Sequence, residues 1–249
     1  MLAAAEQFGE NMSTYRGPMS VVVEFQIRTE TTSLEEWLDE WQKRAEDAFE
    51  FEPETTAYEA CVNVEDSSRV LIFERYARGM DSVQTHMERA AHKHLHAVMR
   101  EKNMTKRRVF SNVAADVTDY GWWSRQEFAE TLRQADLPLV LLCMGFADDV
   151  SRNQFIEMSG AHAEYCSHAE PETLIYSGGI ALNEGKADAP AQKDELLFIM
   201  GCTDDAAVEK HALDANHVAL GERMAAAGVE TISNSLLQYR TTGRGYLWR

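Results

Sequence analysis

Two pairs of histidines share one spacing and are well suited to move a proton near neutral pH. His86 precedes His92 by six positions, and His211 precedes His217 by the same number. An imidazole titrates close to pH 7 and can act as a general acid or base. Six residues of a continuous helix turn through about 600°, so the rings of a pair should point about 120° apart, with one lining a cavity. The alternative is a structural role, which a repeat would duplicate equally well.

A denser histidine cluster lies in the segment AHKHLH, residues 91–96. His92 and His96 are four residues apart and share one helix face, the spacing of a metal-binding pair. No carboxylate ligand is indicated nearby, and His94 and His96 have no counterparts after His217. A solvated helix end is the favoured interpretation, so we predict no metal site and no cofactor.

Glu74 and Tyr76 end a segment that alternates like a β-strand. One face of this strand carries Val70, Ile72, Glu74 and Tyr76, and the other carries Leu71, Phe73 and Arg75. A buried carboxylate has a raised pKa and can serve as a base, which makes Glu74 and Tyr76 catalytic candidates beside the histidines. An ion pair of Glu74 with Arg75 or Arg28 at the strand edge is the slightly favoured alternative.

A cavity for a flat organic ligand needs aromatic walls and a few polar groups. The rings expected to supply such walls, with Tyr76, are Phe25, Tyr58, Phe73 and Phe110. Packing between two sheets is the alternative role for most of them. Asn112 and Asn234 stand in similar strand-like segments, where asparagine is depleted, so they indicate either a polar contact to a ligand or a β-bulge.

The sequence contains an internal repeat. EPETTAY at 52–58 matches EPETLIY at 170–176. Phe73, His86 and His92 match Phe198, His211 and His217 in spacing, and Ser111-Asn112 matches Ser233-Asn234. Three matches in one order, with offsets between 118 and 125, indicate a tandem duplication.

Each copy predicts the same order of elements. In the first copy they are a strand at 20–28, a helix at 33–51 with a Ser33–Glu36 capping box, a hairpin of strands 56–64 and 69–76, one long helix at 81–100, and a strand at 107–117. In the second they are a strand at 138–146, a helix at 151–167, strands at 173–182 and 196–202, one long helix at 205–226, and a strand at 230–239.

The order β-α-β-β-α-β is the ferredoxin-like arrangement, in which two helices cover one face of a four-stranded sheet. We therefore predict an α+β fold with two ferredoxin-like repeats packed sheet to sheet as a fused dimeric α/β barrel. The expected parts are an N-terminal extension (1–18), repeat 1 (19–117), a linker with a short helix (118–137), repeat 2 (138–240) and a C-terminal tail (241–249). This pseudo-dimer could also form a further homodimer.

Residues 52–95 resemble the antibiotic-biosynthesis monooxygenase (ABM) family of dimeric α/β-barrel proteins. The resemblance rests on the turn Glu52-Pro53-Glu54, the strand end Glu74-x-Tyr76, and the helical pair His86 and His92. The second copy keeps the turn and the histidines. It has Ile199-Met200-Gly201 where the first has Glu74-Arg75-Tyr76, which argues against a complete second site.

This resemblance implies one of several activities, because the fold does not fix the reaction. Some members oxygenate polycyclic aromatic compounds without metal or flavin, others degrade haem, and others have no established reaction. Haem degradation is disfavoured, because Ser82 stands near the position of the tryptophan that those members need and the first strand has no asparagine.

The amino-acid composition argues against several classes of binding partner. The chain of 249 residues has a net charge of −17, a field that repels nucleic acid and anionic membranes. Its longest apolar run, 137–147, is too short to span a bilayer, and the first residues do not resemble a signal peptide. The four cysteines, Cys61, Cys143, Cys166 and Cys202, lack paired or metal-type spacing, so a reducing cytoplasm is expected.

These patterns favour two functions over a third, a purely structural or interaction role. The first is a cofactor-independent monooxygenase-like protein acting on a small aromatic or polyketide-like compound, with its site mainly in repeat 1. The second is a non-catalytic barrel protein that binds a small ligand or is associated with stress. In both, a small hydrophobic or aromatic molecule is the expected partner.

Overall fold

The computed structural model describes residues 12–183 and 189–249, so most of the predicted N-terminal extension lies outside the described residues. In chain order the elements of the first half are β1 (Met19–Ile27), α2 (Leu34–Phe51), β2 (Thr55–Asn63), β3 (Arg69–Tyr76), α3 (Gly79–Glu88), α4 (Ala90–Glu101) and β4 (Thr105–Asp116). After the 3₁₀ helix η1 (Gln126–Arg133) come β5 (Ala135–Phe146), α5 (Asp149–Ala169), β6 (Thr173–Ala181), β7 (Leu196–Cys202), α6 (Asp205–Leu213), α7 (Ala215–Ala226) and β8 (Thr231–Thr242).

The eight strands form one closed barrel in the order β1-β3-β2-β8-β5-β7-β6-β4. Each repeat contributes four neighbouring strands in ferredoxin-like order. The two seams are antiparallel: β2 meets β8 with Cys61 opposite Thr241, and β4 meets β6 with Ala114 opposite Ala181. Closure gives every edge strand a hydrogen-bonding partner. The predicted α+β class and fused α/β barrel are confirmed, and the repeats join at their edges as well as facing each other.

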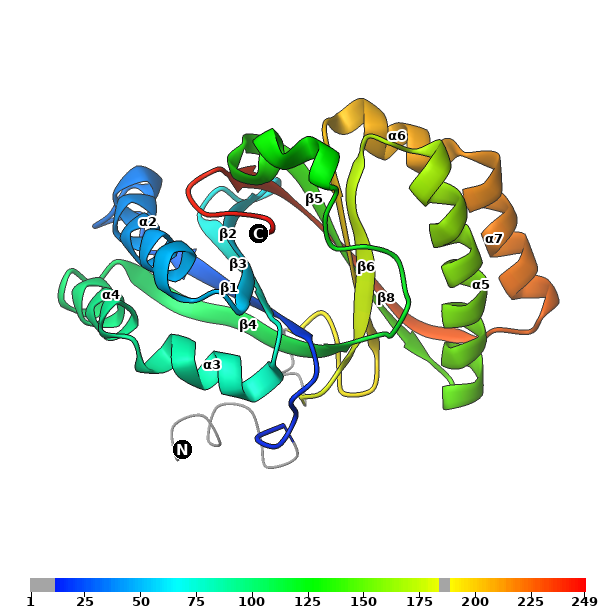
Figure 1. The fold of residues 1–249 in the computed structure, drawn as a ribbon, viewed down its shortest axis with the longest axis horizontal. Helices are drawn as coiled ribbons and strands as arrows, with labels where there is room; N and C mark the ends of the chain where they lie inside the picture. The colour runs from blue at the N-terminus through cyan, green and yellow to red at the C-terminus, as the bar shows by residue number, and fades with distance from the viewer. Residues whose placement is uncertain (1–11, 184–188) are drawn as a thin grey trace.

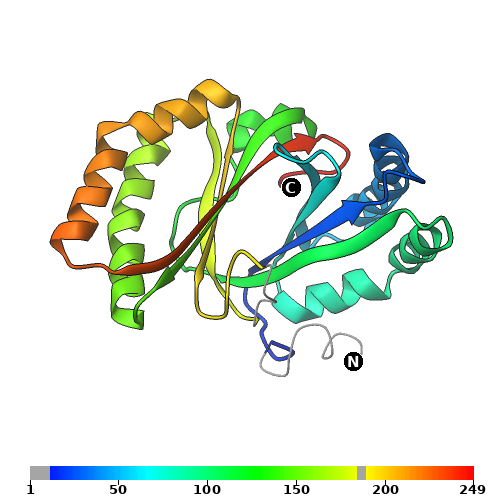
Figure 2. The ribbon, with the colours of Figure 1, turned by 180° about the vertical axis from the view of Figure 1, so that it is seen from behind.

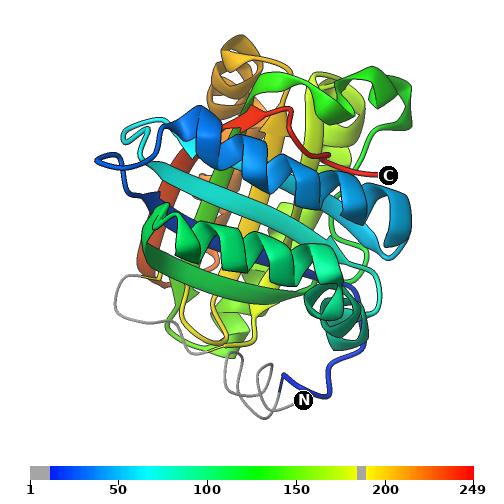
Figure 3. The ribbon, with the colours of Figure 1, turned by 90° about the vertical axis from the view of Figure 1, so that its left-hand side faces the viewer.

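The helices cover the outside of the barrel on two opposite sides. Those of repeat 1 lie on one side and those of repeat 2 on the other (Figure 1). Seen from the repeat 1 side, α2 and α4 run across the outer face of their sheet (Figure 3). The predicted capping box begins α2, since Ser33 and Glu36 exchange hydrogen bonds. None of the described helices is long and apolar enough to cross a membrane.

Side chains from both repeats fill the inside of the barrel. Alternation along each strand determines which side chains face inward. In β3, as predicted, Leu71 and Phe73 face the barrel interior, whereas Val70 and Ile72 pack beneath the helices. The opposite wall supplies Leu139, Leu141, Leu197 and Ile199. The barrel interior is therefore a packed core, and space for a ligand must lie between the sheets and the helices.

The long helix predicted before the last strand of each repeat consists of two shorter helices, α3 and α4 in repeat 1 and α6 and α7 in repeat 2. Arg89, between α3 and α4, has φ −55° and ψ 138°, and Asp214, between α6 and α7, has φ −61° and ψ 135°. Asp214 begins α7, because its carboxylate accepts the Asn216 N–H. These extended residues turn the chain at equivalent places, so the predicted 120° between the histidines of a pair does not hold.

The strand register corrects two of the residue matches between the repeats. Tyr58 stands opposite Glu74, and the equivalent Tyr176 stands opposite Met200. Glu74 therefore corresponds to Met200 and Tyr76 to Cys202, one position later than the spacing indicated. A slip of one residue moves a side chain to the other face of a strand. Phe73 accordingly lies inside the barrel, whereas Phe198 packs beneath the helices of repeat 2.

The asparagine match is also out of register, by three residues, because the position of Asn112 corresponds to that of Leu237. Asn112 stands opposite Val22, inside the barrel, and hydrogen bonds to the carbonyl of Ala191 at 2.8 Å. Asn234 stands opposite Met144 and is exposed at the rim of the repeat 2 cavity.

The end of the chain returns from repeat 2 to repeat 1. β8 crosses the back of the barrel towards β2, close to the C-terminus (Figure 2). Tyr246 pairs with Tyr58 through two backbone hydrogen bonds of 2.8 and 2.9 Å, and its ring is fully buried. The buried carboxylate of Glu59 accepts backbone N–H groups of residues 242, 243 and 245 at 3.0–3.1 Å. The tail is thus part of the fold of repeat 1.

Candidate functional site

A cavity of about 580 Å³ lies in repeat 1 between the outer face of the sheet and its helices. Its walls are largely aromatic and aliphatic, with Phe25, Trp37, Trp41, Tyr58, Ile72 and Tyr76 among them. Its polar groups include Glu74, His86, His92, His96, Arg100 and Arg108. The size and the mixture suit a flat organic ligand with a few polar substituents.

His86 is the most constrained polar group of this cavity. Its Nδ1 lies 2.8 Å from Oε2 of Glu52, and its side chain is 2 % exposed. Arg44 completes the cluster: its Nη2 contacts the other carboxylate oxygen of Glu52, lies 2.7 Å from His86 Nδ1, and donates to the His86 carbonyl at 3.2 Å. The Glu52-Pro53 turn thus fixes a carboxylate behind the imidazole, and α2 supplies a cation.

The opposite nitrogen of His86 is free to react. Nε2 is buried and has no hydrogen-bond partner among the described residues. If Nδ1–H donates to Glu52, Nε2 presents a lone pair and His86 is a base. If Nδ1 accepts from Arg44, Nε2–H is a donor instead. In either arrangement Nε2 can exchange a hydrogen bond or a proton with a group in the cavity.

Charge decides the protonation state of Glu52. Burial on its own would raise the pKa of this carboxyl, but the hydrogen bond and charge of His86 and the charge of Arg44 outweigh it and hold the pKa at about 2. Glu52 is therefore ionised at physiological pH. An ionised carboxylate behind an imidazole orients the ring and stabilises the imidazolium that forms when it takes a proton.

The break between α3 and α4 brings His92 to the same cavity as His86. Their ring centres are 5.0 Å apart, and His92 Nε2 lies 3.0 Å from His96 Nε2. Burial and the charges of His86 and His96 lower the pKa of His92 to about 3. His92 is consequently a neutral donor or acceptor near pH 7. The two helix-face neighbours His92 and His96 do meet, as their spacing predicted.

Glu74 and Tyr76 also reach the cavity together. The Tyr76 hydroxyl donates to Glu74 Oε2 at 2.5 Å. Burial raises the pKa of Glu74, against the opposing charge of His86. Glu74 has no ion pair with Arg75, which instead contacts Asp116 at 2.7 Å. The predicted strand-edge ion pair is thus replaced by a hydroxyl–carboxyl pair that faces the cavity.

Other predicted ligand-binding residues are divided between two places. Phe25 and Tyr58 line the repeat 1 cavity. Phe73, Phe110 and Asn112 do not: all three are buried in the barrel interior, on the opposite face of the sheet, because alternation sends their side chains inward. The predicted set of cavity-lining rings therefore combined side chains from the two opposite faces of the sheet.

A second cavity of about 600 Å³ occupies the equivalent place in repeat 2. It contains the predicted His211, His217 and Asn234. Where repeat 1 has Glu74 this cavity has Met200, and it is otherwise lined mainly by apolar side chains such as Val140, Phe155 and Phe198. The two cavities of one chain therefore differ in chemistry.

Sequence reasoning missed three residues on the first helices of the repeats, one on α2 and two on α5. Arg44, His162 and Cys166 were not among the candidates. Arg44 and His162 each stand eight residues before the glutamate of their EPE turn, so the duplication itself could have identified them. Both residues precede the first matching segment of the repeat, which begins at the EPE turn.

Comparison with known protein families finds a match within repeat 1. Residues 18–98 match the family model of antibiotic biosynthesis monooxygenase. Repeat 1 is an ABM domain. The match spans β1 to most of α4, and so includes Glu52, Glu74, Tyr76, His86 and His92. No curated protein matches the sequence significantly.

Solved structures share the whole fused fold. A proposed monooxygenase from Lactobacillus acidophilus matches with a TM-score of 0.68 and 13 % identity, covering 94 % of this chain and 99 % of that one. A proposed monooxygenase from Fusobacterium nucleatum matches with a TM-score of 0.68 and 12 % identity, over 95 % and 99 % of the two chains. An anthrone oxidase-like protein matches with a TM-score of 0.55 and 12 % identity, over 93 % of each. At these identities the likeness concerns the fold.

Proposed function

We propose that the ABM domain of repeat 1 is a cofactor-independent monooxygenase acting on a small aromatic or polyketide-like compound. The observation that carries the proposal is the free, buried Nε2 of His86 at the wall of an aromatic cavity, with Nδ1 against the ionised Glu52. This arrangement supplies a base at the wall of a cavity where a flat substrate can lie.

In the proposed reaction His86 removes a proton from a C–H group activated by an adjacent phenol or carbonyl. The resulting carbanion gives one electron to O₂, the radical pair combines to form a C–O bond, and protonation yields a hydroperoxide. Loss of water leaves a carbonyl, so that R₂CH₂ and O₂ give R₂C=O and H₂O. The electrons come from the substrate, and the protein contributes orientation and charge stabilisation.

The neighbouring groups fit this chemistry. Neutral His92 and the Tyr76–Glu74 pair can hydrogen bond to substrate oxygens without competing for its proton. Arg100 and Arg108 line the same cavity, and their positive charge favours an anionic phenolate. The related anthrone oxidase-like structure motivates dithranol, a hydroxylated anthrone with an acidic CH₂ group, as the first probe.

The test measures O₂ consumption and quinone formation with dithranol for the full chain and for two variants. His86→Gln removes the base, and we expect kcat to fall about 10²–10⁴-fold. His94→Ala is the matched control, since His94 is exposed on α4 and does not line the cavity. Equal turnover by the wild type and His86→Gln, with both folded, would refute the base assignment. Dithranol binding without turnover in the wild type would favour the non-catalytic ligand-binding alternative.

A further inference from the structure

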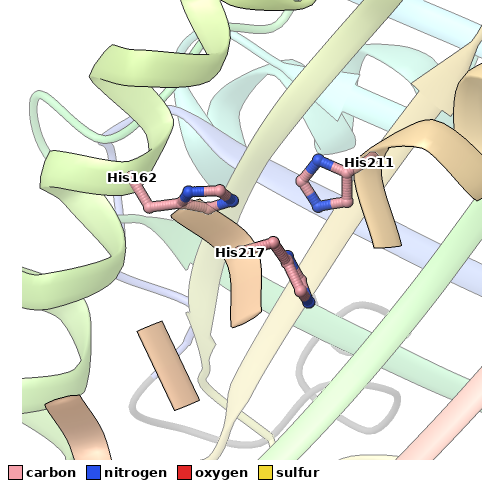
Figure 4. A group of neighbouring side chains, drawn as sticks. All are labelled: His162, His211 and His217. Atoms are coloured by element: carbon pink, nitrogen blue, oxygen red, sulfur yellow. The ribbon is translucent and has the colours of Figure 1, made fainter. Parts of the chain in front are cut away.

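Three histidines of repeat 2 converge from three helices. His162 lies on α5, His211 on α6 and His217 on α7, and their side chains lie next to one another (Figure 4). The ring centres are 5.4, 5.3 and 4.6 Å apart, and one nitrogen from each ring lies within 4.8 Å of the others. Imidazole nitrogens on one tetrahedral zinc ion stand about 3.4 Å apart, so small side-chain rotations would complete a shared site.

Oxygen partners hold the Nδ1 atoms of two of the rings, and the Cys166 sulfur lies 3.4 Å from Nε2 of His162. Nδ1 of His162 lies 2.8 Å from Oδ1 of Asn216, and Nδ1 of His211 lies 2.8 Å from Oε2 of Glu170. An oxygen acceptor at Nδ1 fixes the proton there and leaves the Nε2 lone pair available. Carboxylates and amides orient metal-binding histidines in this way. His217 adds a buried Nδ1 without a partner among the described residues.

Comparison within the chain shows what repeat 2 has changed. Arg44 and His162 each stand eight residues before the glutamate of the EPE turn, and Ala48 and Cys166 each stand four before it. The carbonyls of Ala48 and Cys166 accept the same helix-ending hydrogen bond from that glutamate. The positions are therefore equivalent. Repeat 2 has replaced a guanidinium with an imidazole and a methyl group with a thiol.

This replacement reverses the electrostatics of the cluster. In repeat 1 the Arg44 guanidinium sits 2.7 Å from His86 and would repel a cation. In the described part of repeat 2 the side-chain partners of the three histidines are Asn216, Glu170 and the Cys166 sulfur, which lies 3.4 Å from His162 Nε2. None of these described partners carries a fixed positive charge, and each of them tolerates or favours a metal ion.

We propose that His162, His211 and His217 bind one divalent transition-metal ion of the zinc class at the wall of the repeat 2 cavity. Three imidazoles suit Zn²⁺ and its first-row neighbours better than Mg²⁺ or Ca²⁺. Since His211 and His217 line the 600 Å³ cavity, the remaining coordination position faces space that a ligand or water can fill. Three protein ligands with one open position are typical of catalytic rather than structural zinc sites.

The experiment uses the full chain without an affinity tag, stripped with a chelator and titrated with Co²⁺ as a spectroscopic substitute for Zn²⁺. We expect one equivalent per chain, with the visible absorption of low-symmetry Co²⁺, and displacement by Zn²⁺. His162→Arg restores the repeat 1 arrangement, including a guanidinium beside Glu170, and should weaken binding about 100-fold or more. His217→Ala is a second loss-of-ligand variant at a less buried position.

Two further variants locate the site. His92→Ala, the equivalent of His217→Ala in repeat 1, should leave the single equivalent intact. Arg44→His should give a second equivalent, because it supplies the third imidazole next to His86 and His92. Absence of Co²⁺ binding at micromolar concentrations by the wild type would overturn the proposal. So would retained affinity in both His162→Arg and His217→Ala, or loss of affinity in His92→Ala.

Discussion

Replacing Glu52 with glutamine tests the charge cluster behind His86 directly. A glutamine at this position keeps the size of the side chain but cannot ionise, so it resembles the protonated form of Glu52. In the native protein that carboxylate faces Arg44, Thr55 and His86, and its side chain is 2 % exposed. We expect Glu52→Gln to destabilise the protein at neutral pH and to have little effect in strong acid.

The magnitude follows from the pKa of Glu52. Its ordinary value of 4.5 falls to about 2 in the folded protein, a difference of about 2.5. At about 1.4 kcal/mol per unit this corresponds to about 3 kcal/mol of folding free energy. The sign is that of a lowered acid: the stabilisation is complete well above pH 4.5 and is lost as the pH falls towards 2.

The assay is urea unfolding followed by tryptophan fluorescence between pH 3 and pH 7. The difference in unfolding free energy between wild type and Glu52→Gln should shrink from about 3 kcal/mol at pH 7 to about 1 kcal/mol at pH 3. Glu54→Gln is the control, since Glu54 pairs with the largely exposed Arg78 and should contribute less than about 1 kcal/mol. A difference that stays constant with pH would refute the charge argument and indicate a packing effect.

Three other predictions concern the rest of the structure. Glu59→Ala should lower the stability by about 2–4 kcal/mol and expose residues 243–249 to proteolysis, because the backbone N–H groups of the tail lose their acceptor; melting temperature and limited proteolysis measure both effects. Phe73→Ala should cost about 3–5 kcal/mol in urea unfolding while leaving ligand affinity in the repeat 1 cavity unchanged, since its ring fills the barrel interior; a large change in affinity at unchanged stability would contradict this. His92 should show no protonation between pH 5 and 8 in an NMR titration, because its pKa lies at about 3.

The duplication explains how one chain comes to hold two different cavities. In a homodimer of single repeats, a substitution appears in both copies at once. In a fused chain each copy can change on its own, so Glu74 in one cavity stands against Met200 in the other. A second such difference lies on the first helix of each repeat, where Arg44 in repeat 1 corresponds to His162 in repeat 2. The proposed proton chemistry of repeat 1 and metal binding of repeat 2 both rest on this independence.

Several features of the fold could be predicted from local patterns. Alternation in β3, the capping box of α2 and the repeated EPE turn depend on residues that are neighbours in the chain, and the structure agrees with each. The helix breaks at Arg89 and Asp214 could not be predicted in this way. The segments around them are compatible with a continuous helix, and the deviation is confined to one extended residue in each.

Equivalence between the repeats was harder to predict than the repeat itself. Spacing paired Phe73 with Phe198, one residue out of register, and Asn112 with Asn234, three residues out of register. In a β-strand a shift by an odd number of residues sends a side chain to the opposite face. Only the pairing of Tyr58 with Glu74 and of Tyr176 with Met200 reveals the true register.

By itself the sequence determined the element order, the two copies and the presence of repeated histidine pairs, because these follow from periodicity and repetition along the chain. The tertiary structure decided which residues meet. It joined His86 to Glu52 and Arg44, placed His162 against His211 and His217, and sent Phe110 into the barrel interior. Such contacts depend on helix breaks, strand register and barrel closure, which are set by the packing of segments far apart in the chain.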